Sequence, residues 1–578
     1  MFFLFSVRHF LLFSLLTLFA CSQTYAAETA AQIEKRFEKP PKPLSKPKRV
    51  EVPKSDSTQA PEGAEDVKFI LKDLNIDGSS VFEKDQFLNL YEKYLDQEIS
   101  LKTVYELTAA LTRFYTNRGY LLSRAVVPPQ TIDGGIVRLQ VVEGYIEKVV
   151  FEGLDGKRPD ILNHYANRLT SIRPITSKAI ERYLLLANDL PGLQFQTVLS
   201  PSESAIGGTI LEFKAIQTNY QGNYSFDNYG SESSGPLQLM VSAQANDLFG
   251  RFDQTSITYA TVPNDQDELK YLMLAHSQHL NGEGLKFDLG YTSSTTIPDI
   301  DFVRALSGPG TESNSLSGYL GLTYPFVRSR EKNLSLSTNL TYRDSTTDNT
   351  NITLTDIQAA IASGATREEL IGLIGARDQL TVLSLGINYD QADTLLGGGI
   401  NLISLTLKQG LKLFGAQAES RLDADESFTS VNYYLSRVQM LNANWTANLR
   451  LNGQFSDDAL VSSEQAGLGG EGTVRGYDPS EWTGDSLISG GLQMNYRFTE
   501  EKLNNVQLYG FYEGGKVRKK YISAGEEKTV VKHSYGFGTT ISLPYETGFS
   551  LELVRPNEND SNNESPEWKL FARLQGTF

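Results

Sequence analysis

Alternation of polar and apolar residues dominates the C-terminal part of this 578-residue chain. From about residue 217 to the end, roughly sixteen segments of about ten residues change polarity at every second position, as the strands of a transmembrane barrel do. In residues 334–342 and 445–453, one face is apolar and the other carries Ser, Thr, Asn or Arg. No segment after Ala20 reaches the roughly 18 unbroken apolar residues that a membrane helix needs. A chain of this kind can therefore span a membrane only as a closed β-barrel.

The lengths of the connections separate this interpretation from a soluble β-sandwich, which also alternates but buries its apolar face. Residues 246–250 and 280–284 are tight turns, and they alternate with long connections. Short turns on one rim and long loops on the other are typical of outer-membrane barrels. We therefore predict a mainly β protein in which residues 217–578 form a transmembrane antiparallel β-barrel of about 16 strands. The long connections are residues 295–313, 346–378, 413–427 and 457–485.

The last strand carries a second signal of a barrel. From Trp568 to the terminal Phe578, every second residue is apolar or small, so these side chains share one face. An aromatic end of this kind resembles the signal that the barrel-assembly machinery reads. It also suits a strand that ends at a membrane interface, where aromatic rings are favoured. We expect Trp568 and Phe578 to form this assembly signal.

Two consecutive units precede the barrel, and each has the element order β-α-α-β-β. We place the first at residues 67–144 and the second at 145–216. A small three-stranded sheet backed by two helices leaves an edge strand free, which can receive an extended peptide through main-chain hydrogen bonds. Units that act only as structural spacers are the alternative. The expected strands are 69–74, 124–127, 136–142, 146–151, 194–199 and 209–215, and the expected helices are 84–95, 101–118, 159–169 and 177–190.

The N-terminus is predicted to be a secretory signal peptide, residues 1–26, because a short apolar stretch is followed by small residues suited to cleavage. The only cysteine, Cys21, lies in an imperfect lipobox, so its lipidation is an alternative. Residues 27–66 combine a possible short helix at 28–39 with a proline-rich linker. Plain disorder is the other interpretation of this region.

Composition and motifs argue against several functions. The formal net charge of −16 argues against nucleic acid as a partner, because its phosphates are also negatively charged. His276 and His279 are three residues apart on a predicted strand, so they leave opposite faces and cannot share a metal. Residues 510–516 have the spacing of a phosphate loop, but Val517 replaces the required Ser or Thr, and the segment fits a glycine-bearing strand better. We expect no enzyme activity, no cofactor and no metal.

The most unusual segment is the glycine-rich stretch 469–477, in the long connection at 457–485. Its glycines surround the single guanidinium of Arg475, which suggests backbone close to a neighbour and a cation reaching a fixed anion. Residues 511–515, in a predicted strand, contain the candidate anion, Glu513. An ordinary glycine-rich loop with a solvated arginine is the alternative.

With these motifs, the chain resembles the two-partner secretion transporters of the haemolysin secretion/activation family, within the outer-membrane insertase and translocase superfamily. Each α/β unit resembles a POTRA domain. The specific motifs are at 227–230, 474–477 and 511–515. In the family, the tip arginine holds a lid loop inside the barrel through an acidic residue, more often aspartate than the glutamate found here. The resemblance assigns the lid-loop motif to Val474, Arg475, Gly476 and Tyr477, and its partner on the barrel wall to Phe511, Glu513 and Gly515.

The resemblance also implies a location and a mechanism. The barrel would lie among the lipids of a Gram-negative outer membrane, with the POTRA domains in the periplasm and an N-terminal helix able to plug the pore. An unfolded exoprotein of the haemolysin or adhesin type would dock on the POTRA domains and thread through the barrel without nucleotide. The barrel-assembly machinery would insert the transporter itself.

Three other functions are alternatives to a two-partner secretion transporter. An insertase of the barrel-assembly type usually has more POTRA repeats than two. No catalytic motif supports an outer-membrane enzyme, and a passive porin needs neither POTRA repeats nor a lid arginine.

The predicted external loop contains an insertion at 353–374, where Thr355 or Asp356 is expected to cap one helix and Thr366 with Glu369 a second. The insertion either touches an emerging substrate or shields the mouth of the barrel.

Overall fold

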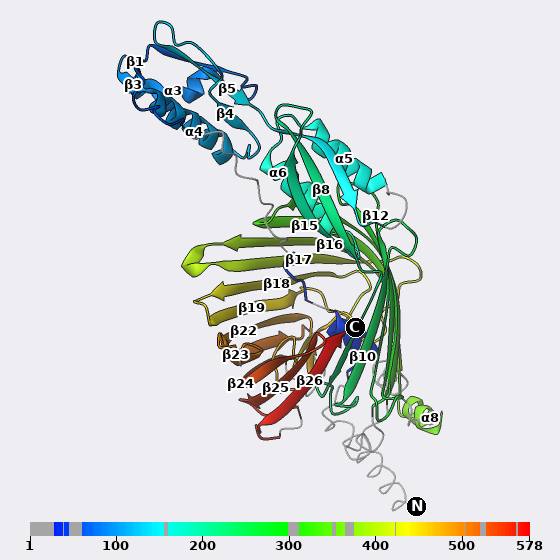
Figure 1. The fold of residues 1–578 in the computed structure, drawn as a ribbon. Helices are drawn as coiled ribbons and strands as arrows, with labels where there is room; N and C mark the ends of the chain where they lie inside the picture. The colour runs from blue at the N-terminus through cyan, green and yellow to red at the C-terminus, as the bar shows by residue number, and fades with distance from the viewer. Residues whose placement is uncertain are drawn as a thin grey trace, which may run out of the picture.

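The computed structural model contains one large barrel and two smaller α/β units (Figure 1). The predicted signal peptide, Cys21 and most of the proline-rich linker lie outside the residues that the structure describes. None of the helices in the described part of the chain is both long enough and apolar enough to cross a membrane. The described residues are 28–38, 40–44, 60–154, 160–298, 311–349, 354–364, 375–421, 423–501, 503–520, 528–561 and 564–578.

Sixteen strands close the barrel, which confirms the predicted architecture and number. All neighbours are antiparallel, and the last strand pairs with the first. In chain order the strands are β9 (Tyr220–Asp227), β10 (Gln238–Asn246), β11 (Asp253–Thr261), β12 (Leu269–His279), β13 (Lys286–Thr296), β14 (Thr311–Arg328), β15 (Lys332–Asn349), β16 (Gly375–Asp393), β17 (Gly399–Leu411), β18 (Thr429–Met440), β19 (Trp445–Phe455), β22 (Ser486–Arg497), β23 (Val506–Arg518), β24 (Thr529–Leu543), β25 (Thr547–Pro556) and β26 (Lys569–Thr577).

Alternation divides each strand between the outside and the lumen. On β23, Phe511 and Glu513 are buried inside the barrel, whereas Leu508 and Tyr512 face outward and are exposed. Outward leucines on β14, β16, β17, β19 and β22 are exposed in the same way. A belt of exposed leucine is unfavourable in water but matches the hydrocarbon core of a bilayer. The lumen side chains are therefore the ones available for chemistry inside the barrel.

Three strands are longer than the ten-residue segments predicted from the sequence. β14, β15 and β16 contain 18, 18 and 19 residues. They continue pairing past the apolar segments, because residues 343–348 and 375–380 form ladder partners although they carry many polar side chains. The two ends of the predicted loop 346–378, residues 346–349 and 375–378, are thus β-structure, and the helix α8 (Leu354–Ala362) lies between them. Thr355 and Asp356 lie inside α8, so neither caps it; the second predicted helix lies outside the described residues.

The two α/β units have the same sheet topology. The first contains β1 (Lys68–Ile70), β2 (Asp73–Asp77), η2 (Lys84–Phe87), α3 (Leu88–Tyr91), η3 (Glu92–Tyr94), β3 (Glu98–Ser100), α4 (Leu101–Asn117), β4 (Arg124–Val126) and β5 (Ile136–Val142). The second contains β6 (Tyr145–Glu152), α5 (Asp160–Ser171), α6 (Ser177–Asn188), β7 (Leu193–Pro201) and β8 (Gly208–Gln217). The sheet orders β2-β5-β4 and β6-β8-β7 correspond: β2 is parallel to the central β5, β6 is parallel to the central β8, and β4 and β7 are antiparallel to them.

Two details of the first unit differ from the sequence prediction. The expected strand 69–74 is two strands, because the chain turns after Ile70 so that β1 pairs with β3 while β2 pairs with β5. The expected helix 84–95 is broken into η2, α3 and η3. The sheet nevertheless packs on α4 through a core that includes Leu74, Val104, Leu111 and Leu139.

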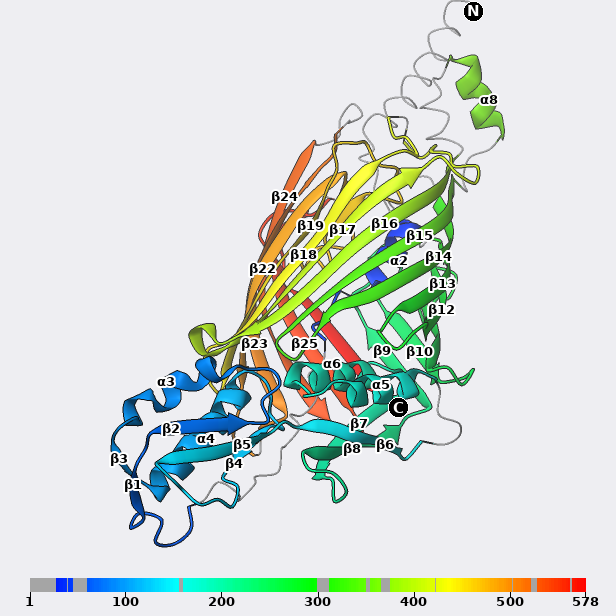
Figure 2. The ribbon, with the colours of Figure 1, turned by 90° about the horizontal axis from the view of Figure 1, so that it is seen from above.

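The second unit lies against one end of the barrel (Figure 2), and charged side chains make contacts between them. The Glu283 carboxylate, in the turn between β12 and β13, lies 3.1 Å from His164 Nε2 and 3.4 Å from Arg182 Nη2. Arg328, at the end of β14, binds both carboxylate oxygens of Asp189 at 2.7 Å. These contacts join α5 and α6 to the barrel end that carries the short turns.

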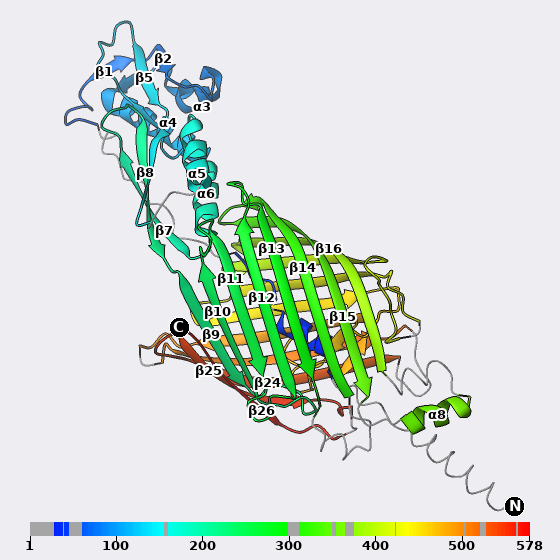
Figure 3. The ribbon, with the colours of Figure 1, turned by 90° about the vertical axis from the view of Figure 1, so that its right-hand side faces the viewer.

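A helix near the N-terminus, α2 (Ala30–Phe37), lies inside the barrel (Figure 3). Thr29 caps the helix with its hydroxyl, and Gln32 completes a capping box. Ile33 is fully buried in a cluster with β11 and β12, and the Phe37 ring packs edge-on against Tyr271 at 4.9 Å. The helix expected at 28–39 therefore exists, and it occupies part of the lumen.

Candidate functional site in the barrel lumen

The glycine-rich segment folds back into the barrel. Residues 456–485, between β19 and β22, are called the lid loop here. The loop contains the short hairpin β20 (Ala466–Leu468) and β21 (Trp482–Gly484), whose tip carries the motif 474–477. Val474 is fully buried, and it packs with Leu468 and Tyr477 of the loop against the barrel-wall residue Val517. This apolar cluster fixes the loop tip against β23.

Glycine is required at two places in this packing. Gly476 has φ of +89°, a conformation that L side chains rarely adopt. On β23, a Cβ added to Gly515 would lie 2.4 Å from Leu468 Cδ1 and 3.2 Å from Val474 Cγ2. The absent side chain at Gly515 is what lets the lid loop touch the strand.

Arg475 joins the lid loop to two barrel strands. Its Nη2 and Nε atoms lie 2.8 Å and 3.1 Å from the two carboxylate oxygens of Glu513 on β23. Its Nη1 atom lies 2.8 Å from Glu552 Oε1 on β25. Only 8% of Arg475 and 3% of Glu513 are exposed. The structure therefore brings together the cation and the anion that the sequence analysis proposed, and it adds a second carboxylate.

Two further contacts surround this pair. The Arg475 guanidinium lies over the Phe511 ring, 3.4 Å from its centroid, which is a cation–π contact. Arg450 of β19 places its Nη2 atom 3.1 Å from Glu513 Oε1. Two guanidinium groups thus face the carboxylates of Glu513 and Glu552, and their formal charges balance. Removing Glu513 or Arg475 would leave the buried charge of the other residue uncompensated, which costs about 3–5 kcal/mol in buried pairs.

The lid loop also contacts α2. Glu464 of the loop accepts hydrogen bonds from Arg343 of β15 at 2.7 Å and Lys408 of β17 at 3.1 Å. Arg343 also lies 3.4 Å from Glu34 of α2. From the same helix, Lys35 Nζ lies 3.9 Å from Glu464 and donates to the main-chain oxygen of Gln465 at 3.2 Å. A single ionic network therefore connects the lumen helix, the lid loop and two strands of the barrel wall.

The two residues of the predicted assembly signal flank the last strand. Trp568 precedes β26 and packs edge-on against Tyr535 and Phe537 on the outer surface, while Phe578 follows β26 and covers Gly222. Their role as an assembly signal stays a prediction. Residues 510–516 lie within β23, so the phosphate-loop alternative is wrong. In the described part of the chain, no group of three or more His, Cys, Asp or Glu residues is placed to hold a metal.

Sequence reasoning missed several members of the site. Glu552 and Arg450 lie at inward positions of β25 and β19, where a charged residue in an alternating strand is itself a signal. Glu464 had no such signal, because its partners Lys35, Arg343 and Lys408 come from segments far away in the chain.

Two family models match the chain. The model of the haemolysin secretion/activation protein ShlB/FhaC/HecB matches residues 207–541, and that of the ShlB-type POTRA domain matches residues 69–144. Among curated proteins, the heme/hemopexin transporter protein HuxB of Haemophilus influenzae is 25% identical over 491 residues, which cover 83% of this chain and 82% of the relative. The outer membrane transporter CdiB of Dickeya dadantii is 24% identical over 474 residues, covering 77% and 76%.

Solved structures share the fold. CdiB from Escherichia coli superimposes with a TM-score of 0.68 at 19% identity, covering 92% of this chain and 93% of that one. CdiB from Acinetobacter baumannii gives a TM-score of 0.59 at 14% identity, covering 95% and 96%. BamA from Haemophilus ducreyi lacking POTRA domains 1–3 gives 0.53 at 14% identity, covering 88% and 100%. These likenesses extend over both the barrel and the units that precede it.

Proposed function

The chain belongs to the haemolysin secretion/activation protein family ShlB/FhaC/HecB, and we propose that it exports an unfolded exoprotein of the haemolysin or adhesin type through its barrel. The protein is a two-partner secretion transporter of the outer membrane with a ShlB-type POTRA domain in the periplasm. The observation that carries the proposal is the filled lumen: α2 and the lid loop lie where a passing chain must go and are joined through Glu464.

We assign the second α/β unit, residues 145–216, as a second POTRA domain, and the first to residues 67–144. The support is the shared topology, β2-β5-β4 and β6-β8-β7. In both sheets the outer strands pair on one side only, with the central β5 or β8. An extended exoprotein segment can add to such an edge through main-chain hydrogen bonds, with little demand on its sequence.

Threading needs no nucleotide in this proposal, and the protein is not an enzyme. Its work is conformational: α2 leaves the lumen, the lid loop shifts, and the exoprotein passes as an extended chain. The Arg475–Glu513 pair acts as a latch that sets the position of the lid loop rather than as a catalytic group. Lipids of the outer membrane contact the exposed leucine belt, and the barrel-assembly machinery inserts the strands beginning from the Trp568–Phe578 end.

The experiment is to delete the gene in its host and to search the medium for the large exoprotein whose secretion depends on it. We expect the exoprotein to disappear from the medium and to return when the intact gene is supplied. Normal exoprotein export together with a general loss of outer-membrane proteins would instead favour an insertase of the barrel-assembly type. A matched strain carrying Arg475→Ala tests whether the latch takes part.

A further inference from the structure

The seam between the first and last strands is the shortest ladder of the barrel. β9 and β26 share five Cα pairs, from Asn223↔Thr577 to Asp227↔Arg573. The neighbouring ladders, β9–β10 and β25–β26, each have eight. Two main-chain hydrogen bonds between Gly222 and Phe578 and one from the Asn228 nitrogen to the Ala572 oxygen continue the seam beyond these pairs, and it still has fewer paired residues than its neighbours.

Side chains extend the seam where the ladder stops. Asn228, just after β9, donates from Nδ2 to the main-chain oxygen of Leu570 at 2.9 Å and accepts from the main-chain nitrogen of Ala572 at 2.7 Å. The Asn228 side-chain amide thus makes the two hydrogen bonds to β26 that a main-chain N–H and C=O would make in a further ladder pair. The Tyr229 ring follows and stacks on Phe571 of β26, with ring centroids 4.9 Å apart.

Arg573 of β26 binds both sides of the seam and the lid loop. Its Nε atom lies 3.0 Å from Asp227 Oδ2 on β9. Its Nη1 and Nη2 atoms lie 2.8 Å from the two carboxylate oxygens of Glu471 in the lid loop, a bidentate contact. The guanidinium also lies 4.4 Å from the centroid of the Tyr229 ring. One cation therefore has a carboxylate on the first strand and a carboxylate on the lid loop.

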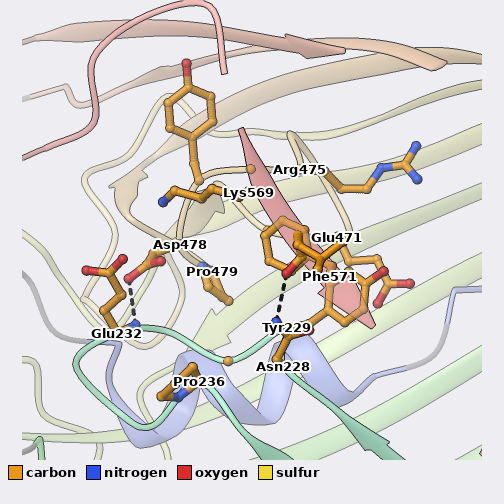
Figure 4. Close-up of a pocket in the computed structure, with 15 residues that line it drawn as sticks. Asn228, Tyr229, Glu232, Pro236, Glu471, Arg475, Asp478, Pro479, Lys569 and Phe571 are labelled. Carbon is orange, nitrogen blue, oxygen red and sulfur yellow. Dashed lines mark hydrogen bonds between the residues drawn. The ribbon is translucent and has the colours of Figure 1, made fainter. Parts of the chain in front are cut away.

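The lid loop contacts the first-strand side a second time. The main-chain nitrogen of Glu232, in the connection after β9, donates to Asp478 Oδ2 at 2.9 Å (Figure 4). Between these contacts lies a pocket of about 160 Å³, lined by the connection after β9, the start of β26 and the lid-loop tip. The lid tip therefore spans the seam from the inside, although 53% of the Glu471 side chain is exposed, so water in the lumen weakens its ion pair.

We propose that Glu471, Arg573 and Asp227 form a clamp that couples the docked lid loop to the closed seam. Arg573 is the positioning residue: when the lid loop leaves, Arg573 keeps only Asp227 and the Tyr229 ring on the first-strand side, and the short ladder loses its inner support. When the seam loosens, Arg573 moves and the lid loop loses an anchor. This coupling concerns the barrel alone and does not depend on which exoprotein is exported.

The test measures each end of the clamp after a change at the other end. Val474→Cys reports the lid loop, because this side chain is fully buried when the loop is docked and reacts with a maleimide only when the loop leaves. Phe226→Cys with Leu574→Cys reports the seam, because these residues are Cα partners across it and can form a disulfide when it is closed. Both are measured in outer membranes on the folded, heat-modifiable form, and proteins with neither or only one of the new cysteines supply the background.

We expect Asp227→Asn, which does not touch the lid loop, to raise maleimide labelling at Val474→Cys by roughly fivefold, the lower end of the coupling between linked sites. Glu471→Gln, which does not touch β9, should lower the yield of the seam disulfide. The matched control is Arg437→Gln on β18, which removes an ion pair of 2.7 Å with Asp393 away from the seam and should change neither signal. Unchanged labelling in Asp227→Asn, or an unchanged disulfide yield in Glu471→Gln, overturns the proposal.

Discussion

Arg343 Nη1 lies 2.7 Å from Glu464 Oε1 inside the barrel, and the same guanidinium lies 3.4 Å from Glu34 of α2. A strand of the barrel wall thus holds the lid loop and the lumen helix with one side chain. Both carboxylates and the guanidinium are nearly buried. Release of the helix would expose these buried charges to water or require new partners for them, so we expect the network to oppose that release.

The first prediction concerns this network. Glu464→Gln removes the charge that Arg343, Lys408 and Lys35 share and leaves these three cations with only the Glu34 carboxylate, so α2 should leave the lumen more often. We expect a several-fold higher probability of the open state in planar-bilayer recordings. Asp425→Asn is the control, because the Asp425 side chain is more than half exposed and its ion pair with Lys412 lies outside this network. Identical conductance in the two variants would contradict the role given to Glu464.

The second prediction concerns close packing at Gly515. A methyl group there meets Leu468 at 2.4 Å, so Gly515→Ala should displace the lid loop and cost about 1–3 kcal/mol, the usual penalty of overpacking. Gly510→Ala on the same strand is the control, since its Cβ would meet only a main-chain oxygen at 3.8 Å. Export and the temperature of barrel unfolding on semi-native gels should fall for Gly515→Ala alone. Equal export and equal unfolding temperatures in the two variants would show that the close approach of the lid loop to Gly515 is not needed.

The third prediction concerns pH at the contact between the second unit and the barrel. Burial alone raises the pKa of Glu283, but hydrogen bonds from His164, Tyr183 and Arg182 outweigh it and hold this pKa below the ordinary 4.5. Because the pKa is depressed in the docked state, the contact contributes fully above pH 4.5 and is lost as the pH falls through the lower, docked value. Spin labels on α5 and on the turn after β14 should report a broader distance distribution in acid. Glu283→Gln should abolish this broadening in acid. If the distance distribution of Glu283→Gln still broadens as the pH falls, another titratable group causes the pH dependence.

The parts of the site that could be predicted from the sequence are those marked by a pattern within one short segment. Alternation placed Phe511 and Glu513 on one face of a strand, and the glycines around Arg475 marked a close approach. The same alternation could have pointed to Glu552. It could not pair Glu464 with Lys35, because 429 residues of chain separate them and only closure of the barrel brings them together. Nor could it show that β14–β16 run past their apolar segments, because main-chain hydrogen bonds rather than side-chain polarity extend them.

We propose that the Arg475–Glu513 latch is needed for export and not for assembly of the barrel. Its direct measurement is the amount of exoprotein in the medium from cells that produce Arg475→Ala or Glu513→Ala, normalised to heat-modifiable barrel in the outer membrane. We expect export to be abolished in both variants while the folded barrel remains. Normal export by Arg475→Ala, with the barrel present at the unaltered level, would contradict it.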